Sequence, residues 1–291
     1  MAYLLALLSA GFYGAADFTG GIVTRRAAAI PVVLLSQACG LVLVALALPF
    51  LPAATPRTAD LWWGAIAGLT GGIGVALLYY ALAIGTMSVV APTTAVAAVA
   101  LPVLTSIALG ERPRLLVMLG MLLGVAAIIL VSRAPRSPSS EEPALSAANG
   151  RGGQGVRTGI GHALLAGIFV GLFLITLAQT RPEAGMWPLV TDRIASVGFF
   201  AIVAGVGRRS LRMPVRLATL AVLGGSLDMI ANGLYLIAAR IGPLSPVVTL
   251  ASLYPASTVL LARAILGERL SAWQTACVVT ALIAVLLIVR G

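Results

Sequence analysis

Ionisable side chains inside long apolar stretches are the first residues of this sequence that could do chemistry. The clear cases are Asp17, Asp192, Arg193, Asp228 and Arg263. Because a charge within hydrocarbon is costly, such residues face a cavity or pair with one another. They could bind a polar group of a solute. The structural alternative is an internal salt bridge of Asp17 or Asp228 with Arg193 or Arg263, which would only hold helices together.

Two of these carboxylates belong to polar and aromatic stripes. Residues three or four positions apart share one face of a helix, and two such faces are formed by Ser9, Tyr13 and Asp17 and by Asp228, Asn232 and Tyr235. Other tyrosines could stack on a ligand while their hydroxyls form hydrogen bonds, or could be ordinary packing residues. We therefore expect a site for an amphipathic organic solute, formed by Tyr13, Asp17, Tyr79, Tyr80, Asp228, Asn232, Tyr235 and Tyr254.

Common signatures of catalysis and cofactor binding are absent from the sequence. It has no GxxxxGK[ST] loop for nucleotide phosphates and no HExxH or GxSxG motif. His162 is its one histidine, and Cys39 and Cys277 lie in separate apolar runs. We expect no catalytic residue, metal site or cofactor. The basic residues lie mostly between apolar runs or at their ends, as in membrane proteins, so we expect no nucleic acid partner.

The composition places these residues in a lipid bilayer. The chain has 291 residues, is 60% hydrophobic and 10% charged, and has a mean hydropathy of +1.05. A helix needs about 20 apolar residues to cross the hydrocarbon. We therefore predict an all-α polytopic membrane protein with ten transmembrane helices, at residues 3–23, 30–49, 61–84, 89–109, 115–132, 158–180, 187–206, 215–239, 246–265 and 272–290.

The ten expected spans form two similar halves. A segment rich in Pro, Ser and Gly, residues 133–157, separates five spans in residues 1–132 from five in 158–291, and we expect it to be a flexible linker. At an offset of 157 residues, Gly68 matches Gly225 and the element Leu-Gly-Glu-Arg at 109–112 returns at 266–269. Because each half has an odd number of spans, the second half enters the membrane inverted.

The two halves are not equivalent at their charged positions. At the same offset, Asp17 lies opposite Leu174 and Asp228 lies opposite Gly71. The Gly-Glu-Arg element, by contrast, is present in both halves. Since Gly can end a helix in a left-handed conformation, we expect this element to form a tight turn at the membrane surface rather than to bind a solute directly.

Ten spans, two five-span halves and a Gly-Glu-Arg element after the fourth span of each half resemble the EamA-type members of the drug/metabolite transporter superfamily. The resemblance implies a central cavity lined mainly by the first, third, fourth, sixth, eighth and ninth spans. It also implies a secondary transporter, and the tyrosines favour aromatic or other hydrophobic amino acids, or related metabolites, as solutes. We expect export by alternating access, in a bacterial inner membrane, by a chain that can act as a monomer.

Other readings stay open at this point. Protons are a candidate coupling ion. The alternative to a transporter is a polytopic intramembrane enzyme that acts on a lipid or peptide, and a passive channel is a third possibility.

Because the linker offers neither a core nor candidate site residues, the halves should assemble without it. Co-expression of residues 1–140 and 150–291 as separate chains should recover part of the transport of the intact chain, measured in membrane vesicles. Complete loss, with both fragments present in the membrane by immunoblot, would contradict the prediction.

Overall fold

The computed structural model describes residues 1–84, 87–132, 152–208, 210–254 and isolated positions after them. Several expected features lie outside the described residues: Arg263, the second Leu-Gly-Glu-Arg element at 266–269, Cys277 and residues 133–151 of the linker. The last residues of the expected linker are described, and they differ from the prediction. They are helical, because α7 begins at Gly152. Once a helix exists, each added residue extends it at low cost, even where the sequence is polar.

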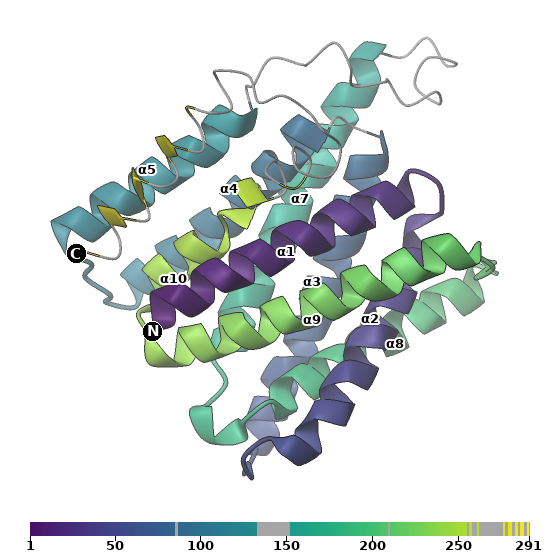
Figure 1. The fold of residues 1–291 in the computed structure, drawn as a ribbon, viewed down its shortest axis with the longest axis horizontal. Helices are drawn as coiled ribbons and strands as arrows, with labels where there is room; N and C mark the ends of the chain where they lie inside the picture. The colour runs from purple at the N-terminus through teal and green to yellow at the C-terminus, as the bar shows by residue number, and fades with distance from the viewer. Residues whose placement is uncertain are drawn as a thin grey trace.

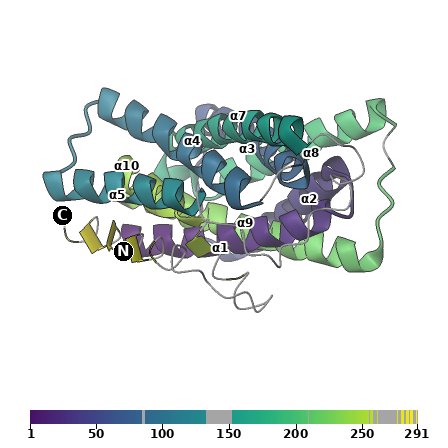
Figure 2. The ribbon, with the colours of Figure 1, turned by 90° about the horizontal axis from the view of Figure 1, so that it is seen from above.

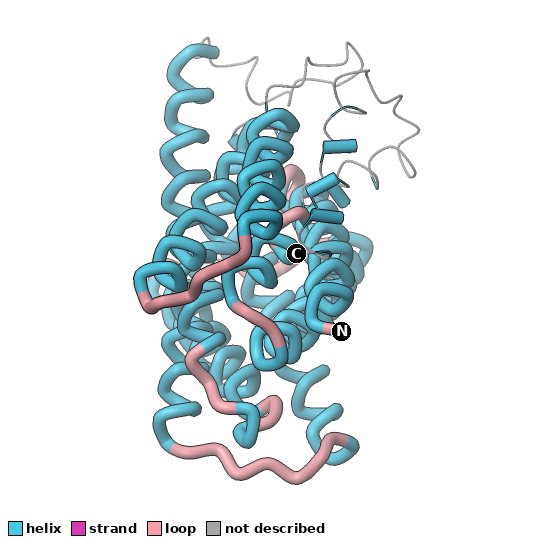
Figure 3. Tube along the Cα trace, turned by 90° about the vertical axis from the view of Figure 1, so that its left-hand side faces the viewer, coloured by secondary structure: helices cyan, strands magenta, loops and turns pink. Residues whose placement is uncertain are grey.

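Helices and the loops between them make up the described part of the chain (Figure 3). The α-helices are α1 (Ala2–Thr24), α2 (Ala29–Ala47), α3 (Thr58–Ile84), α4 (Met87–Ala108), α5 (Leu115–Ser132), α7 (Gly152–Ala178), α8 (Trp187–Val206), α9 (Val215–Ile241) and α10 (Leu244–Ala251). Two short 3-10 helices, η1 (Leu48–Phe50) and η2 (Pro182–Ala184), lie in the connections after α2 and α7.

Five of the described helical segments are long and apolar enough to cross a membrane: Ala29–Phe50, Thr58–Ile84, Gly161–Ala178, Trp187–Val206 and Val215–Ile241. Their outer surfaces expose large apolar side chains, for example Leu46, Val206 and Val215, as lipid contact requires. These helices support a multi-pass membrane protein. Ten spans remain an expectation.

The helix boundaries repeat along the chain as the sequence predicts. Both the first and the last residue of α9 follow those of α3 by 157 positions, and α10 begins 157 positions after α4. The packing repeats as well. Helix α9 lies beside α1 and α2, while α3 lies beside α7 and α8 (Figures 1 and 2). Each third helix therefore packs on the first two helices of the other half.

The expected span from Pro246 to Ile265 is interrupted. Helix α10 ends at Ala251, and Ser252 and Leu253 form a turn. The sequence contains the reason, because Pro255 has no N–H to donate to the carbonyl of Ala251 and its ring would clash there. Pro255 itself lies outside the described residues. The interruption places the end of α10 inside the bundle rather than at its surface.

The turn after α4 has the predicted geometry. Gly110 has a φ of +100° and its N–H donates to the carbonyl of Ile107, which closes the helix. The next residue does more than complete the turn. Glu111 accepts a hydrogen bond of 3.1 Å from the backbone N–H of Ser245, and the hydroxyl of Ser245 also donates to it. The carboxylate of the first half thus caps the first turn of α10 in the second half.

Glycines allow the two halves to approach closely. A Cβ added at Gly68 would overlap the backbone of Asp192 in α8, and one added at Gly225 would overlap the backbone of Ser36 in α2. These two glycines are partners in the repeat. Small residues at such positions are how membrane helices reach backbone contact, since lipid leaves no hydrophobic driving force between helices.

Replacing Gly225 by alanine should lower the free energy of unfolding by about 1–3 kcal/mol, because the added methyl group meets backbone that cannot move aside. The matched control is Gly233→Ala on the same helix, where nothing lies within 4 Å of the added Cβ. The control should leave stability unchanged or raise it slightly, since alanine favours the helix. Chemical denaturation in detergent micelles measures both, and equal stabilities would refute the proposed contact.

Candidate functional site

A cavity lies in the middle of the bundle, between the two halves. Its volume is about 60 Å³, which is room for a few water molecules. The first half contributes α1, α2 and α3, and the second contributes α7, α8, α9 and the end of α10. The lining residues are Tyr13, Asp17, Gln37, Gly71, Gly72, Val75, Leu78, Val170, Phe173, Leu174, Asp192, Arg193, Asp228, Asn232, Ala251, Ser252 and Tyr254.

The cavity contains a guanidinium held between two carboxylates. Nη2 of Arg193 donates to Oδ2 of Asp228 at 2.7 Å, and its Nε lies 3.3 Å from Oδ2 of Asp192. Nε also contacts the sulfur of Met229 at 3.4 Å. The Arg193 side chain is only 3% exposed. Burial strengthens the attraction between these charges, because little water screens them.

A chain of hydrogen bonds extends from this ion pair to the first half. Nδ2 of Asn232 donates to the same Asp228 oxygen at 3.0 Å, and the hydroxyl of Tyr13 donates to Oδ1 of Asn232. The ring of Tyr13 in turn lies edge-on to that of Tyr254, with centroids 6.5 Å apart. Helices α8, α9 and α1 are therefore connected through buried polar groups at the centre of the bundle.

Asp17 lies one turn further along α1 from Tyr13, on the same cavity wall. Within the described part of the chain, its carboxylate has neither a hydrogen bond nor an ion pair. Asp17 therefore differs from the other two carboxylates of the cavity, which both contact Arg193.

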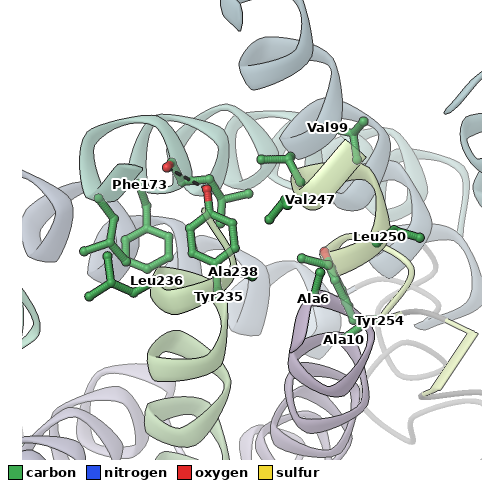
Figure 4. Packing of buried hydrophobic residues seen from close by; sticks show 14 of the residues in the cluster. Ala6, Ala10, Val99, Phe173, Tyr235, Leu236, Ala238, Val247, Leu250 and Tyr254 are labelled. Carbon is green, nitrogen blue, oxygen red and sulfur yellow. Dashed lines mark hydrogen bonds between the residues drawn. The ribbon is translucent and has the colours of Figure 1, made fainter. Parts of the chain in front are cut away.

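The cavity brings together five of the eight residues expected from the sequence: Tyr13, Asp17, Asp228, Asn232 and Tyr254. Of the possible ion pairs of the sequence analysis, Asp228 with Arg193 forms, and those with Arg263 lie outside the described residues. The stripe on α9 is split, because Asn232 lines the cavity whereas Tyr235 is fully buried behind it. The Tyr235 hydroxyl donates to the carbonyl of Leu174 at 2.8 Å (Figure 4).

The two tyrosines of α3 do not line the cavity. Tyr79 is buried and packs so closely on α1 that a Cβ at Gly20 would overlap its hydroxyl. Tyr80 is 48% exposed, and its ring lies 5.1 Å from that of His162. Consecutive residues of a helix point about 100° apart, so these two could not both face one cavity. The structure thus gives Tyr79, Tyr80 and Tyr235 packing or surface positions.

Sequence reasoning missed part of the wall. Gln37 on α2 is a buried lining residue, and Asp192 and Arg193 bring α8 into the cavity. The resemblance implied α4 instead, and no described residue of α4 lines it. A signal for Gln37 was present, since it is a lone amide in a run of apolar residues.

Replacing Arg193 by methionine should lower the free energy of unfolding by about 3–5 kcal/mol, because two carboxylates would lose their buried partner. Adding Asp228→Asn should restore part of the loss, since it removes one of the unpaired charges. Arg216→Met is the control, at an exposed arginine for which the described residues show no ion pair. Denaturation in micelles of the parent, both single variants, the double variant and the control checks this, and additive losses would contradict the coupling.

Comparisons with known proteins agree with this architecture. No curated protein matches the chain. A solved crystal structure has a similar fold, with a TM-score of 0.75 and 19% sequence identity, and the match covers 99% of this chain and 98% of that one. At this identity, the likeness concerns the fold alone. The family model of the EamA-like transporters matches residues 1–133 and again residues 157–290. The chain thus belongs to the EamA-like transporter family, which is part of the drug/metabolite transporter superfamily.

Proposed function

We propose that the chain is a secondary transporter that exports small organic solutes, most of all aromatic or other hydrophobic amino acids and related metabolites, by alternating access. The observation that carries the proposal is the polar cavity between two repeated halves. Membership of a transporter family supports transport of a small solute across a membrane. A site at the interface of structural repeats is where such carriers bind their cargo.

The proposed architecture has ten spans in two inverted halves, residues 1–132 and 158–291, joined by residues 133–157. Within the described residues, the repeated boundaries of α3 and α9 support it. The proposed location is a bacterial inner membrane, where both halves in one chain let a monomer form the whole cavity. Protons are the proposed coupling ion, since the cavity carries titratable carboxylates.

Polar contacts join the two halves at one end of the helices. Nη2 of Arg181, which precedes η2, donates to Oδ2 of Asp60 at the start of α3, at 2.7 Å. The Arg181 backbone N–H donates to the other oxygen of Asp60 at 3.1 Å. The cap of Glu111 on Ser245 lies at the same end of the helices. These contacts join the two halves, so solute access from this end requires them to break.

Alternating access also needs a surface along which the two halves can rock. At Gly68 and Gly225 the contacts are with the backbone of Asp192 and of Ser36. We propose that the halves pivot along them while the Arg181–Asp60 contact opens and closes. The central ion pair of Arg193 then stays within the second half in both states, as a fixed part of the site.

The cavity carboxylates should be needed for transport more than for folding. Asp17→Asn and Asp228→Asn should each lower the rate of movement of labelled phenylalanine in sealed proteoliposomes by about tenfold or more. The reason is that either change removes a charge that faces the solute, worth at least 1.4 kcal/mol. Glu141→Gln is the control, because that carboxylate lies in the linker that we expect to be dispensable.

Two results would contradict the proposal. One is a parental transport rate in both aspartate variants, with each protein folded by thermal melting. The other is recovery of the labelled solute in a chemically changed form, which would indicate an enzyme instead of a carrier. Trans-stimulation by unlabelled solute separates a carrier from a channel.

A further inference from the structure

We infer that the cavity recognises the ammonium group of its solute and makes no use of a solute carboxylate, so that an apolar primary amine binds at least as tightly as the corresponding amino acid. This inference names the chemistry of the proposed transport site and therefore rests on the proposed function. It follows from which polar groups of the cavity have partners and which do not.

Two residues of the cavity carry acceptors that have no donor among the described residues. Oε1 of Gln37 is buried without a hydrogen-bond partner, and its residue is only 4% exposed. The carboxylate of Asp17 has no partner within the described residues. Buried acceptors without donors are costly, so a ligand that brings donors is favoured.

Several donors of the cavity are bound to its own acceptors. Arg193 gives Nη2 to Asp228 and directs Nε towards Asp192 and Met229. Asn232 gives its amide N–H to Asp228, and Tyr13 gives its hydroxyl to Asn232. A solute carboxylate would lie among carboxylates of like charge.

The charges point to the same ligand. Among the described residues, three carboxylates, those of Asp17, Asp192 and Asp228, line the cavity against the guanidinium of Arg193. The C-terminal end of α10 also lies in the wall, at Ala251, and the carbonyl end of a helix carries partial negative charge. An ammonium group supplies one positive charge and three donors. It therefore meets both needs of the site at once.

The remaining wall suits an apolar body on that amine. Phe173 and Tyr254 lie in the lining together with Val75, Leu78 and Leu174. Aromatic faces attract cations and also pack against rings. The cavity thus combines a polar end of acceptors with an apolar, aromatic remainder.

Three probes with one phenyl ring test the inference: 2-phenylethylamine has only the ammonium group, 3-phenylpropionate only the carboxylate, and phenylalanine has both. Titration calorimetry on the purified full chain in detergent should show tight binding of the amine, equal or weaker binding of phenylalanine, and at least tenfold weaker binding of phenylpropionate. Asp17→Asn should weaken amine binding about tenfold or more. Gln37→Met should weaken it as well, and Glu141→Gln should not.

Thermal melting of each variant without ligand shows whether it is folded, and Gln37→Met tests the site if Asp17→Asn fails to fold. Three outcomes overturn the inference: phenylpropionate binds as tightly as the amine, phenylalanine binds more than tenfold tighter than the amine, or the amine does not bind. Unchanged amine affinity in both folded variants overturns it too. Failure of the proposed function looks different. In that case the amine binds as expected but no probe crosses a sealed proteoliposome membrane.

Discussion

The ion pair between Arg193 and the carboxylates of Asp192 and Asp228 is the constraint around which the centre of the molecule is organised. A guanidinium without partners would be very costly at this depth, and so would either carboxylate alone. The first two turns of α8 and the middle of α9 must therefore meet. Asn232 and Tyr13 then extend the network to α1, so one electrostatic requirement positions three helices and one wall of the cavity.

Close helix packing complements this polar centre. Gly68 and Gly225 bring α3 against α8 and α9 against α2, with backbone contacts that any larger side chain would prevent. Packing alone would leave the relative position of the halves poorly determined, because small residues interlock weakly. The polar contacts of Asp60 with Arg181 and of Glu111 with Ser245 supply that specificity at one end. In this interface, the glycines thus allow close approach of the halves, and the hydrogen bonds determine their relative position.

Much of this arrangement could be predicted from the sequence, for physical reasons. The helix boundaries could be predicted from the long apolar runs, their charged ends and the offset of 157 residues, since hydrophobicity and repetition are local properties. Asp17 and Asp228 could be predicted as site residues, because a charged residue in an apolar run is costly unless it faces a cavity or a partner.

The rotation of each helix was harder to predict. Tyr79 and Tyr235 are as amphipathic as Tyr13, and only the packing of neighbouring helices decides which hydroxyl meets the cavity. Gln37 was missed because the resemblance directed attention to other helices, and the early end of α10 because a proline within a span can either kink or end a helix.

The two halves have different side chains at corresponding places in the cavity. Asp17 and Leu174 occupy equivalent repeat positions, as do Asp228 and Gly71, and all four line the cavity. A symmetric dimer of two identical five-helix subunits would have to present each of these side chains twice. It would carry two copies of every carboxylate and could bind a solute equally well in two orientations. Gene duplication followed by fusion removes this restriction, because each copy can then mutate independently. The present chain can therefore offer an unsymmetrical molecule a single binding orientation.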